Sequence, residues 1–189
     1  MPEVDDQLFA LYRDAFPASE RRDESDLRHA LATPAYRLLT KHENDQLLGF
    51  AILFIPPATD FALLEYLAVH PEQHSKGIGR ALVSSAIEQT ASRSLLTEVE
   101  SPTPDPATTR RQQFYRRAGF TPIANLQYQL PLPGNPPPME LWLHQLSPLL
   151  LDHARLSRWL TTIYTDVYAR PSTDPRIAQM LNNLPTPTC

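Results

Sequence analysis

The sequence predicts a mixed α/β fold in which helices flank a central β-sheet and a helical extension follows at the C-terminus. Helix-like and strand-like patterns alternate over residues 8–146, which is typical of a layered α/β domain. A continuous apolar run, Phe61–Val69, contains one acid, Glu65, and predicts a strand that is buried on both faces. The two glycines Gly77 and Gly79 then open a new helical pattern.

The elements of the N-terminal half follow from apolar spacing and from turn residues. The first helix, 8–16, has helical apolar spacing and ends before Pro17. A second short helix, 27–31, precedes two strands joined by a hairpin turn at Asn44 and Asp45. The elements expected in this half are helices at 8–16 and 27–31, strands at 36–40, 47–55 and 61–69, and a helix at 77–92.

In the C-terminal half, proline and glycine residues mark the predicted loops and helix ends. Three prolines predict a loop over 101–107, and Gly119 is a typical C-cap for the helix before it. The expected elements here are a strand at 95–100, a helix at 109–118, strands at 120–130 and 139–146, and one amphipathic helix at 151–169. The last residues, 171–189, are polar and rich in proline, so we expect them to be irregular apart from a turn at 177–181.

Length and composition predict one domain with a short appendage. The 189 residues divide into a main domain, 1–148, and a C-terminal helix and irregular tail, 149–189, packed on it. With a net charge of -4, the chain lacks the excess of basic residues that a nucleic-acid-binding protein usually shows. No apolar run is long enough to span a bilayer. The single cysteine, Cys189, excludes a disulfide within the chain and a cysteine zinc site, so no metal is expected. These features predict a cytoplasmic protein.

The stretch 67–82, LAVHPEQHSKGIGRAL, carries the strongest functional pattern. A buried strand ends, a turn follows, and a helix opens at the glycines, where unpaired N–H groups and the helix dipole favour a phosphate. Lys76 and Arg80 add positive charge. A dinucleotide-binding GxGxxG is excluded because Leu82 stands where the third glycine would be, and the Walker A pattern is absent. The alternative is a strand–turn–helix whose glycines serve packing alone.

The spacing His74-x-x-Gly77-x-Gly79 after a strand that ends Leu67-Ala-Val69 resembles the acetyl-CoA pyrophosphate motif of the GCN5-related N-acetyltransferases (GNAT). The first residue of that motif is usually Arg or Gln, whereas here it is histidine. The resemblance covers residues 8–146 and implies a GNAT-like central mixed sheet. It also implies that coenzyme A is bound by Leu67, Ala68, Val69, His74, Ser75, Lys76, Gly77, Ile78, Gly79 and Arg80.

A second match concerns the chemistry. The helix that ends Tyr115-x-x-x-Gly119-Phe120 matches the family position whose phenol protonates the departing CoA thiolate. The resemblance also implies that the Leu67 or Val69 N–H polarises the thioester oxygen. Taken alone, Tyr115 is better explained, with Phe114, as a core aromatic residue of an amphipathic helix.

Acyl transfer to an amine needs a base, and three carboxylates are candidates. Glu98 lies in a segment similar to the Leu-Glu-Val strand of the ribosomal-protein N-terminal acetyltransferases, and Glu65 lies within the buried strand. We rank both above Glu100, which we place with substrate binding. The alternative for each carboxylate is an ion pair with an arginine. The expected acceptor contacts are Glu20, Arg21, Glu100 and Tyr128, with Arg22 beside them.

The sequence therefore predicts an enzyme that transfers an acetyl group from acetyl-CoA, as cosubstrate, to a primary amine of a small molecule or peptide. A non-catalytic acyl-CoA-binding sensor or scaffold is the alternative, and a nucleotide-binding α/β protein is the third. The acceptor, the acyl chain length and a homodimer stay open.

Overall fold

The computed structural model describes residues 6–90, 93–134, 136–145, 151–182 and 184. The chain forms two compact units, residues 1–97 and residues 98–189. The expected division between residues 148 and 149 falls outside the described ranges and stays a prediction.

The first unit begins with two helices and continues with a three-stranded antiparallel arrangement. Its elements are α1 (Asp6–Ala15), a 3₁₀ turn η1 (Ala18–Glu20), α2 (Glu24–Leu31), β1 (Tyr36–Glu43), β2 (Gln46–Phe54), β3 (Phe61–Val69), a 3₁₀ turn η2 (Pro71–Gln73), α3 (Ile78–Thr90) and the first part of β4 (Ser94–Glu100). The hairpin between β1 and β2 turns at Asn44 and Asp45, as predicted, with φ values of 46° and 63°. Two consecutive left-handed residues fit the right-handed twist of a two-residue hairpin.

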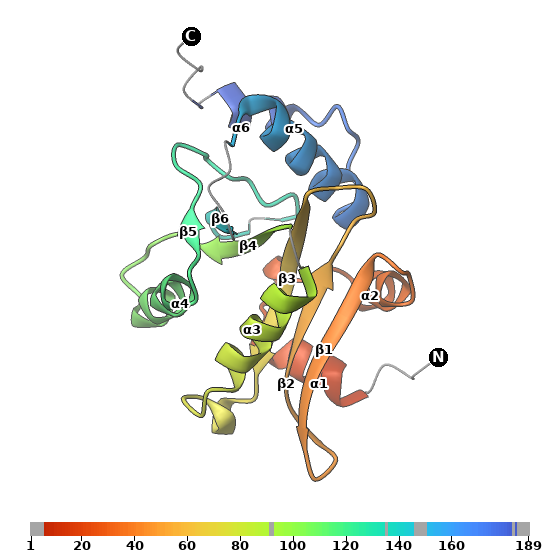
Figure 1. The fold of residues 1–189 in the computed structure, drawn as a ribbon, viewed down its shortest axis with the longest axis vertical. Coiled ribbons are helices and arrows are strands. Elements are labelled where there is room, and N and C mark those ends of the chain that lie inside the picture. The colour runs from red at the N-terminus through yellow and green to blue at the C-terminus, as the bar shows by residue number, and fades with distance from the viewer. Residues whose placement is uncertain (1–5, 91–92, 135, 146–150, 183, 185–189) are drawn as a thin grey trace. The chain divides into compact units, whose positions relative to one another are not determined.

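Strand β3 is the centre of the first unit. It is antiparallel to β2, and over Phe61–Leu64 it is parallel to β4. The expected double burial is confirmed, because Phe61–Tyr66 are all buried. Helix α3 packs on β1, β2 and β3, while α1 packs on β2 and β3; Figure 1 shows α3 in front of these strands and α1 behind them. The strand is therefore covered on both faces.

The second unit contains the end of β4, helices α4 (Pro106–Arg117), α5 (His153–Thr162) and α6 (Pro175–Asn182), strands β5 (Thr121–Pro122) and β6 (Met139–His144), and a π-helical turn η3 (Ile163–Val167). The strand order given by hydrogen bonding is β1-β2-β3-β4-β6-β5. A mixed six-stranded sheet with flanking and C-terminal helices confirms the predicted fold class.

The strand expected over 120–130 is wrong beyond its first residues. The strand β5 is limited to Thr121 and Pro122, and the last hydrogen bond to β6 runs from the Ile123 amide to the Leu141 carbonyl at 2.9 Å. Asn125 takes a left-handed φ of 62°, and the Leu126 amide bonds to the Ile123 carbonyl at 3.4 Å. A tight turn at this point ends the ladder.

The helices of the second unit also differ from the expectation. Helix α4 starts at Pro106 and not at 109, because Asp105 caps the Ala107 amide at 2.9 Å and proline suits the first helical position. The single helix expected over 151–169 is instead α5 followed by η3. The expected turn at 177–181 is the helix α6, whose apolar face of Ile177, Met180 and Leu181 is buried.

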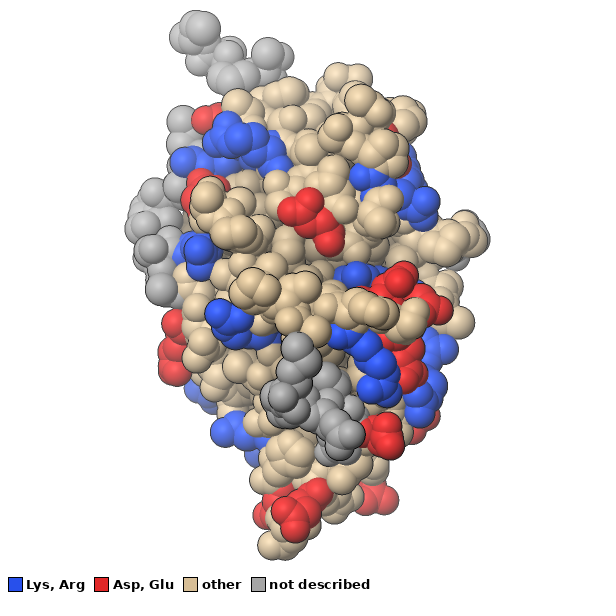
Figure 2. All heavy atoms as spheres, turned by 90° about the vertical axis from the view of Figure 1, so that its right-hand side faces the viewer, with Lys and Arg blue, Asp and Glu red and all other residues tan. Residues whose placement is uncertain are grey.

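The surface carries both charge signs. On the face drawn in Figure 2, acidic and basic side chains are interspersed, and neither sign forms a continuous field. No helix among the described residues has the length and apolar character that crossing a membrane requires.

We predict that Gly49→Ala destabilises the fold by about 1–3 kcal/mol, because an added methyl group overpacks this site. A Cβ at Gly49 would lie 2.7 Å from the carbonyl oxygen of Ala68 on β3. Urea denaturation monitored by circular dichroism measures the change. Lys41→Ala is the matched control, since exposed Lys41 faces Gly49 across the β1–β2 pair and its substitution should shift stability by less than about 0.5 kcal/mol.

Candidate functional site

The turn between β3 and α3 leaves the first amides of the helix exposed. The first helical hydrogen bond runs from the Ala81 amide to the Gly77 carbonyl at 2.9 Å, so the amides of Ile78, Gly79 and Arg80 precede it and have no acceptor within the helix. Two residues of the turn, Ser75 and Gly77, take left-handed φ values of 64° and 83°. A Cβ built at Gly77 would meet nothing within 4 Å, so the turn is open.

Two side chains of this turn are held locally. The His74 Nε2 lies 2.8 Å from the Val69 carbonyl and donates to it, while the His74 amide bonds to Pro71 at 3.2 Å. The Lys76 ammonium donates to the Gln73 side chain at 3.0 Å. The predicted motif is therefore assembled, but the His74 amide already has an acceptor, and the open donors are those that begin α3.

The end of β3 also has backbone available for a ligand. Residues Leu67, Ala68 and Val69 pair with Ala51, Phe50 and Gly49 of β2. Among the described residues of the first unit, the pairing of β3 with β4 ends at Leu64, so this stretch has a partner strand on the β2 side only. Leu67 and Val69 are partly exposed.

Glu65 lies in a β-bulge of this same strand. Ile52 pairs with Tyr66 and Leu53 with Leu64, so Glu65 is the extra residue. Its side chain is 1% exposed and contacts the Arg22 guanidinium at 3.1 Å. Burial raises the pKa of Glu65, and the Arg22 charge and hydrogen bond oppose that shift. Glu65 therefore has the arginine partner that was the alternative to a catalytic role.

Arg22 is held by further contacts of the first unit. Its Nη1 donates to the Tyr36 hydroxyl at 2.9 Å, and its amide donates to the Tyr66 hydroxyl at 3.0 Å. The Tyr12 hydroxyl donates to the Arg22 carbonyl at 3.2 Å, and burial raises the pKa of Tyr12 to about 12. These contacts give the buried ion pair a fixed geometry.

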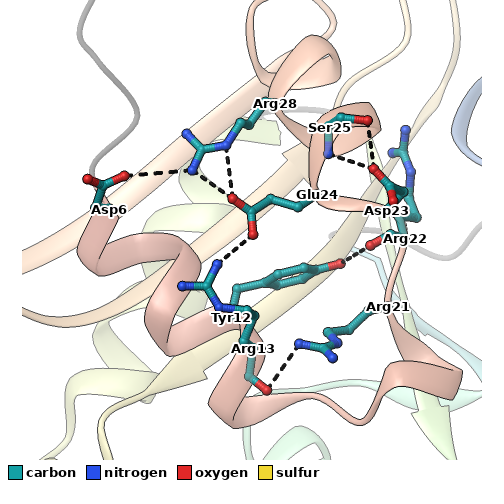
Figure 3. A network of polar contacts seen from close by, with 9 residues as sticks. All are labelled: Asp6, Tyr12, Arg13, Arg21, Arg22, Asp23, Glu24, Ser25 and Arg28. Carbon is teal, nitrogen blue, oxygen red and sulfur yellow. Dashed lines mark hydrogen bonds and ion pairs between the residues drawn. The ribbon is translucent and has the colours of Figure 1, made fainter.

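The expected acceptor residues Glu20 and Arg21 lie beside this ion pair in sequence. Glu20 ends η1, and its carbonyl lies 3.5 Å from the Tyr66 hydroxyl. Figure 3 shows the Arg21 guanidinium donating to the Arg13 carbonyl, at 3.2 Å. In the same figure Glu24 bridges Arg13 and Arg28, at 2.6 and 2.8 Å. The segment is thus fixed between α1 and α2.

In the second unit, Tyr115 lies on the buried side of α4. Its ring is 7% exposed and meets Phe120 edge-on, with centroids 5.5 Å apart. The helix ends as predicted, with Gly119 at a φ of 89° and the Phe120 amide bonded to the Tyr115 carbonyl at 3.0 Å. The Tyr-x-x-x-Gly-Phe motif therefore fixes the backbone around this phenol.

Glu98 accepts hydrogen bonds from two tyrosines of the second unit. The Tyr128 hydroxyl donates to its Oε1, and the Tyr168 hydroxyl donates to its Oε2 at 2.6 Å. Glu98 and Tyr168 are partly exposed, whereas Tyr128 is buried. Burial, reinforced by the Glu98 charge, raises the pKa of Tyr128 well above its ordinary value. Tyr128 is thus placed against a carboxylate.

Glu100 has a different environment from Glu98. Its Oε2 lies 2.6 Å from the Arg111 guanidinium and 3.2 Å from the Thr108 hydroxyl, both on α4. Its carbonyl accepts from Gln112 at 3.0 Å. Glu100 therefore fastens α4 to β4.

Tyr168 was not among the predicted site residues. The sequence pattern assigned it to the apolar face of one long helix, and it lies 70 residues beyond its partner Glu98, so no local pattern indicated the contact. Among the described residues, no cluster of three or more histidine, cysteine, aspartate or glutamate side chains could hold a metal ion.

Comparison with known families now identifies the class of protein. The model of the acetyltransferase (GNAT) family matches residues 5–120, which include the β3–α3 turn and the Tyr115 motif. The chain belongs to the GNAT acetyltransferase family. Among curated protein sequences, none gives a significant match.

Solved structures share the fold. A protein of Bacteroides thetaiotaomicron assigned to the GNAT family aligns with a TM-score of 0.69 and 24% identity over 87% of this chain and 91% of its own. An aminoglycoside 6'-N-acetyltransferase complexed with coenzyme A aligns with a TM-score of 0.60 and 18% identity over 79% of this chain and 94% of its own. The ribosomal-protein-S18-alanine N-acetyltransferase of Escherichia coli aligns with a TM-score of 0.55 and 21% identity over 79% of this chain and 95% of its own.

We predict that Arg22→Met lowers the free energy of unfolding by about 3 kcal/mol at pH 8, because it leaves the buried Glu65 carboxylate without its guanidinium. Burial already raises the pKa of folded Glu65 above 4.5, and losing Arg22 removes the opposing effect. The folded state then takes up a proton at a higher pH than the unfolded state does. The loss is therefore largest above the folded pKa and shrinks as the pH falls toward 4.5.

Urea denaturation at pH 8 and pH 5 measures this effect. The double variant Arg22→Met/Glu65→Leu is the control, and it should regain most of the lost stability because it removes the buried charge. An equal loss for Arg22→Met at both pH values would contradict the assignment.

Proposed function

We propose that this protein transfers the acetyl group of acetyl-CoA to a primary amine of a small molecule or a peptide. The observation that carries the proposal is the open β3–α3 turn, where the helix amides Ile78, Gly79 and Arg80 precede the first helical hydrogen bond. Exposed amides at the positive end of a helix dipole bind a phosphate group without a bulky side chain. Family membership supports coenzyme A as the phosphate carrier.

The remaining coenzyme A contacts that we propose are backbone groups and cations around this turn. The N–H of Leu67 or Val69 polarises the thioester oxygen, and these positions have a partner strand on one side within the first unit. Lys76 and Arg80 contribute positive charge next to the phosphates; both are exposed. The Val69 carbonyl accepts a hydrogen bond from the His74 ring at 2.8 Å. Ala68, His74, Ser75 and Gly77 complete the proposed contact set.

In the proposed reaction, the neutral amine nitrogen attacks the thioester carbonyl carbon, an N–C bond forms, and the C–S bond breaks. Glu98 accepts the proton that the nitrogen loses during the attack, directly or through a water molecule. Tyr115 donates its phenolic proton to the departing thiolate. We place the base at Glu98, because the phenols of Tyr128 and Tyr168 donate to its two carboxylate oxygens and orient them.

The acceptor contacts stay a proposal as well. Glu20 and Arg21 lie next to the buried ion pair of the first unit, and Glu100 is the carboxylate nearest in sequence to the proposed base. A carboxylate-rich environment suits a cationic amine. Aminoglycosides, polyamines, amino acids and peptides are the acceptors to screen, with release of the coenzyme A thiol as readout.

We predict that Gly79→Leu weakens coenzyme A binding at least tenfold, because a side chain here blocks the approach of the phosphates to the helix amides. Leucine favours a helix, so α3 should persist. Isothermal titration calorimetry with coenzyme A measures the affinity. Ser84→Leu, on an exposed position of the same helix, is the matched control and should bind normally. Equal affinities for the two variants would remove the basis of the proposal.

We predict that Tyr115→Phe and Glu98→Gln each retain coenzyme A affinity but slow thiol release by about a hundredfold, since each removes one proton-transfer group. Steady-state thiol release with an acceptor found by the screen, combined with calorimetry, separates binding from chemistry. Normal coenzyme A affinity with no transfer to any acceptor by the unmodified protein would favour a non-catalytic acyl-CoA-binding module.

A further inference from the structure

The carboxylate of Glu98 accepts hydrogen bonds from two parts of the second unit that are distant in sequence. Tyr128 donates to one oxygen, and Tyr168 donates to the other at 2.6 Å. Residues 128 and 168 both lie beyond the segment matched by the family model, which ends at residue 120. The contact made by Tyr168 is therefore contributed by the C-terminal segment of this chain.

A local distortion of the helix precedes Tyr168. Helix α5 changes at Ile163 into the π-helical turn η3, and the Tyr168 amide closes this turn on the Ile163 carbonyl at 3.3 Å. The next residue, Ala169, takes a left-handed φ of 51°, which ends the turn. An i→i+5 turn changes the direction of the residues that follow relative to a continuous α-helix, and such turns occur frequently at functional sites.

The C-terminal segment is anchored on the same stretch that carries Tyr128. The Tyr164 hydroxyl donates to the Gln129 carbonyl at 2.5 Å, and the Arg170 Nε donates to the Pro131 carbonyl at 2.9 Å. The Gln129 amide lies 3.3 Å from the Met180 sulfur of α6. Tyr168 is therefore held between two fixed points, at residues 164 and 170, and not on a free tail.

We propose that Tyr168 of the C-terminal segment is a positioning residue that, with Tyr128, orients the Glu98 carboxylate for proton abstraction from the acceptor amine. This inference rests on the proposed function and deepens it. Each carboxylate oxygen has two lone pairs, so each can accept a phenol and still receive the amine proton. The phenols keep their own protons throughout: the amine proton moves to Glu98, and the thiolate proton comes from Tyr115.

The surrounding charges fit this role. Burial and the Glu98 charge keep Tyr128 protonated, so it stays a donor across the neutral range. The other titratable groups around the pair of tyrosines are Tyr164, Arg170, Asp174 and Arg176. Asp174 and Arg176 form an ion pair at 2.7 Å, and this pairing holds the pKa of Asp174 at about 2.

The test compares Tyr168→Phe with Tyr164→Phe in the full-length protein. Both variants lose one phenol oxygen from the same segment, but only the first loses a donor to Glu98. Carbon-13 NMR of labelled glutamate, with Glu98→Gln used to assign the signal, follows the ionisation of the Glu98 carboxyl without any substrate. We expect Tyr168→Phe to move the titration midpoint of Glu98 upward by about one pH unit, because the ionised form loses a donor. Tyr164→Phe should leave it in place.

Activity supplies the second readout. In Tyr168→Phe, kcat/KM for the acceptor should fall about tenfold with unchanged coenzyme A affinity, and the acidic limb of its pH profile should move upward with the NMR midpoint. Equal shifts in both variants would show that only segment packing matters and would overturn the inference, as would an unmoved midpoint in Tyr168→Phe. If the NMR midpoint shifts but the unmodified protein transfers no acetyl group, both the proposed function and the positioning role are overturned. If the protein is active but Tyr168→Phe changes neither readout, only the positioning role is overturned.

Discussion

A helix cannot satisfy the amides of its own first turn, and the β3–α3 connection places three such amides at the surface. The connection depends on backbone conformation more than on side chains: left-handed φ values at Ser75 and Gly77 turn the chain from a strand buried on both faces into α3. A polar, anionic ligand suits these donors, because the helix dipole adds to their attraction. Because the turn begins at the end of the buried strand β3, the direction of the amides at the start of α3 is fixed before any ligand binds.

The same strand carries a charge that its burial makes costly. Glu65 occupies a bulge, where the extra residue disturbs the ladder, and its carboxylate needs a partner inside the unit. Arg22 reaches it from the connection between η1 and α2. The Tyr36 hydroxyl accepts a hydrogen bond from the Arg22 guanidinium, and the Tyr66 hydroxyl accepts one from the Arg22 amide. A buried pair of this kind adds little net stability, but removing one partner is strongly destabilising. Its structural effect is therefore to fix where the η1–α2 connection lies over β3.

Local patterns predicted the parts of the fold that local physics determines. The strand Phe61–Val69, the Asn44–Asp45 hairpin turn and the glycine turn before α3 all lie where the sequence places them, because each depends on neighbouring residues. The strand predicted over 120–130 is wrong beyond Pro122, because a turn with a left-handed φ at Asn125 ends the pairing with β6. The contact between Glu98 and Tyr168 spans 70 residues and follows a π-helical turn, so it depends on tertiary packing that apolar periodicity does not encode.

The three candidate carboxylates were indistinguishable as residue types, and their partners separate them. An arginine partner compensates the charge of a carboxylate and occupies its oxygens in fixed directions, as at Glu65 and Glu100. Phenols such as Tyr128 and Tyr168 donate hydrogen bonds but carry no charge, so they orient the Glu98 carboxylate without neutralising it. For the base that we propose at Glu98, these neutral donors fix the direction of the carboxylate and leave its charge in place. One of them, Tyr168, lies in the C-terminal part of the chain, beyond the residues 5–120 that the family model matches.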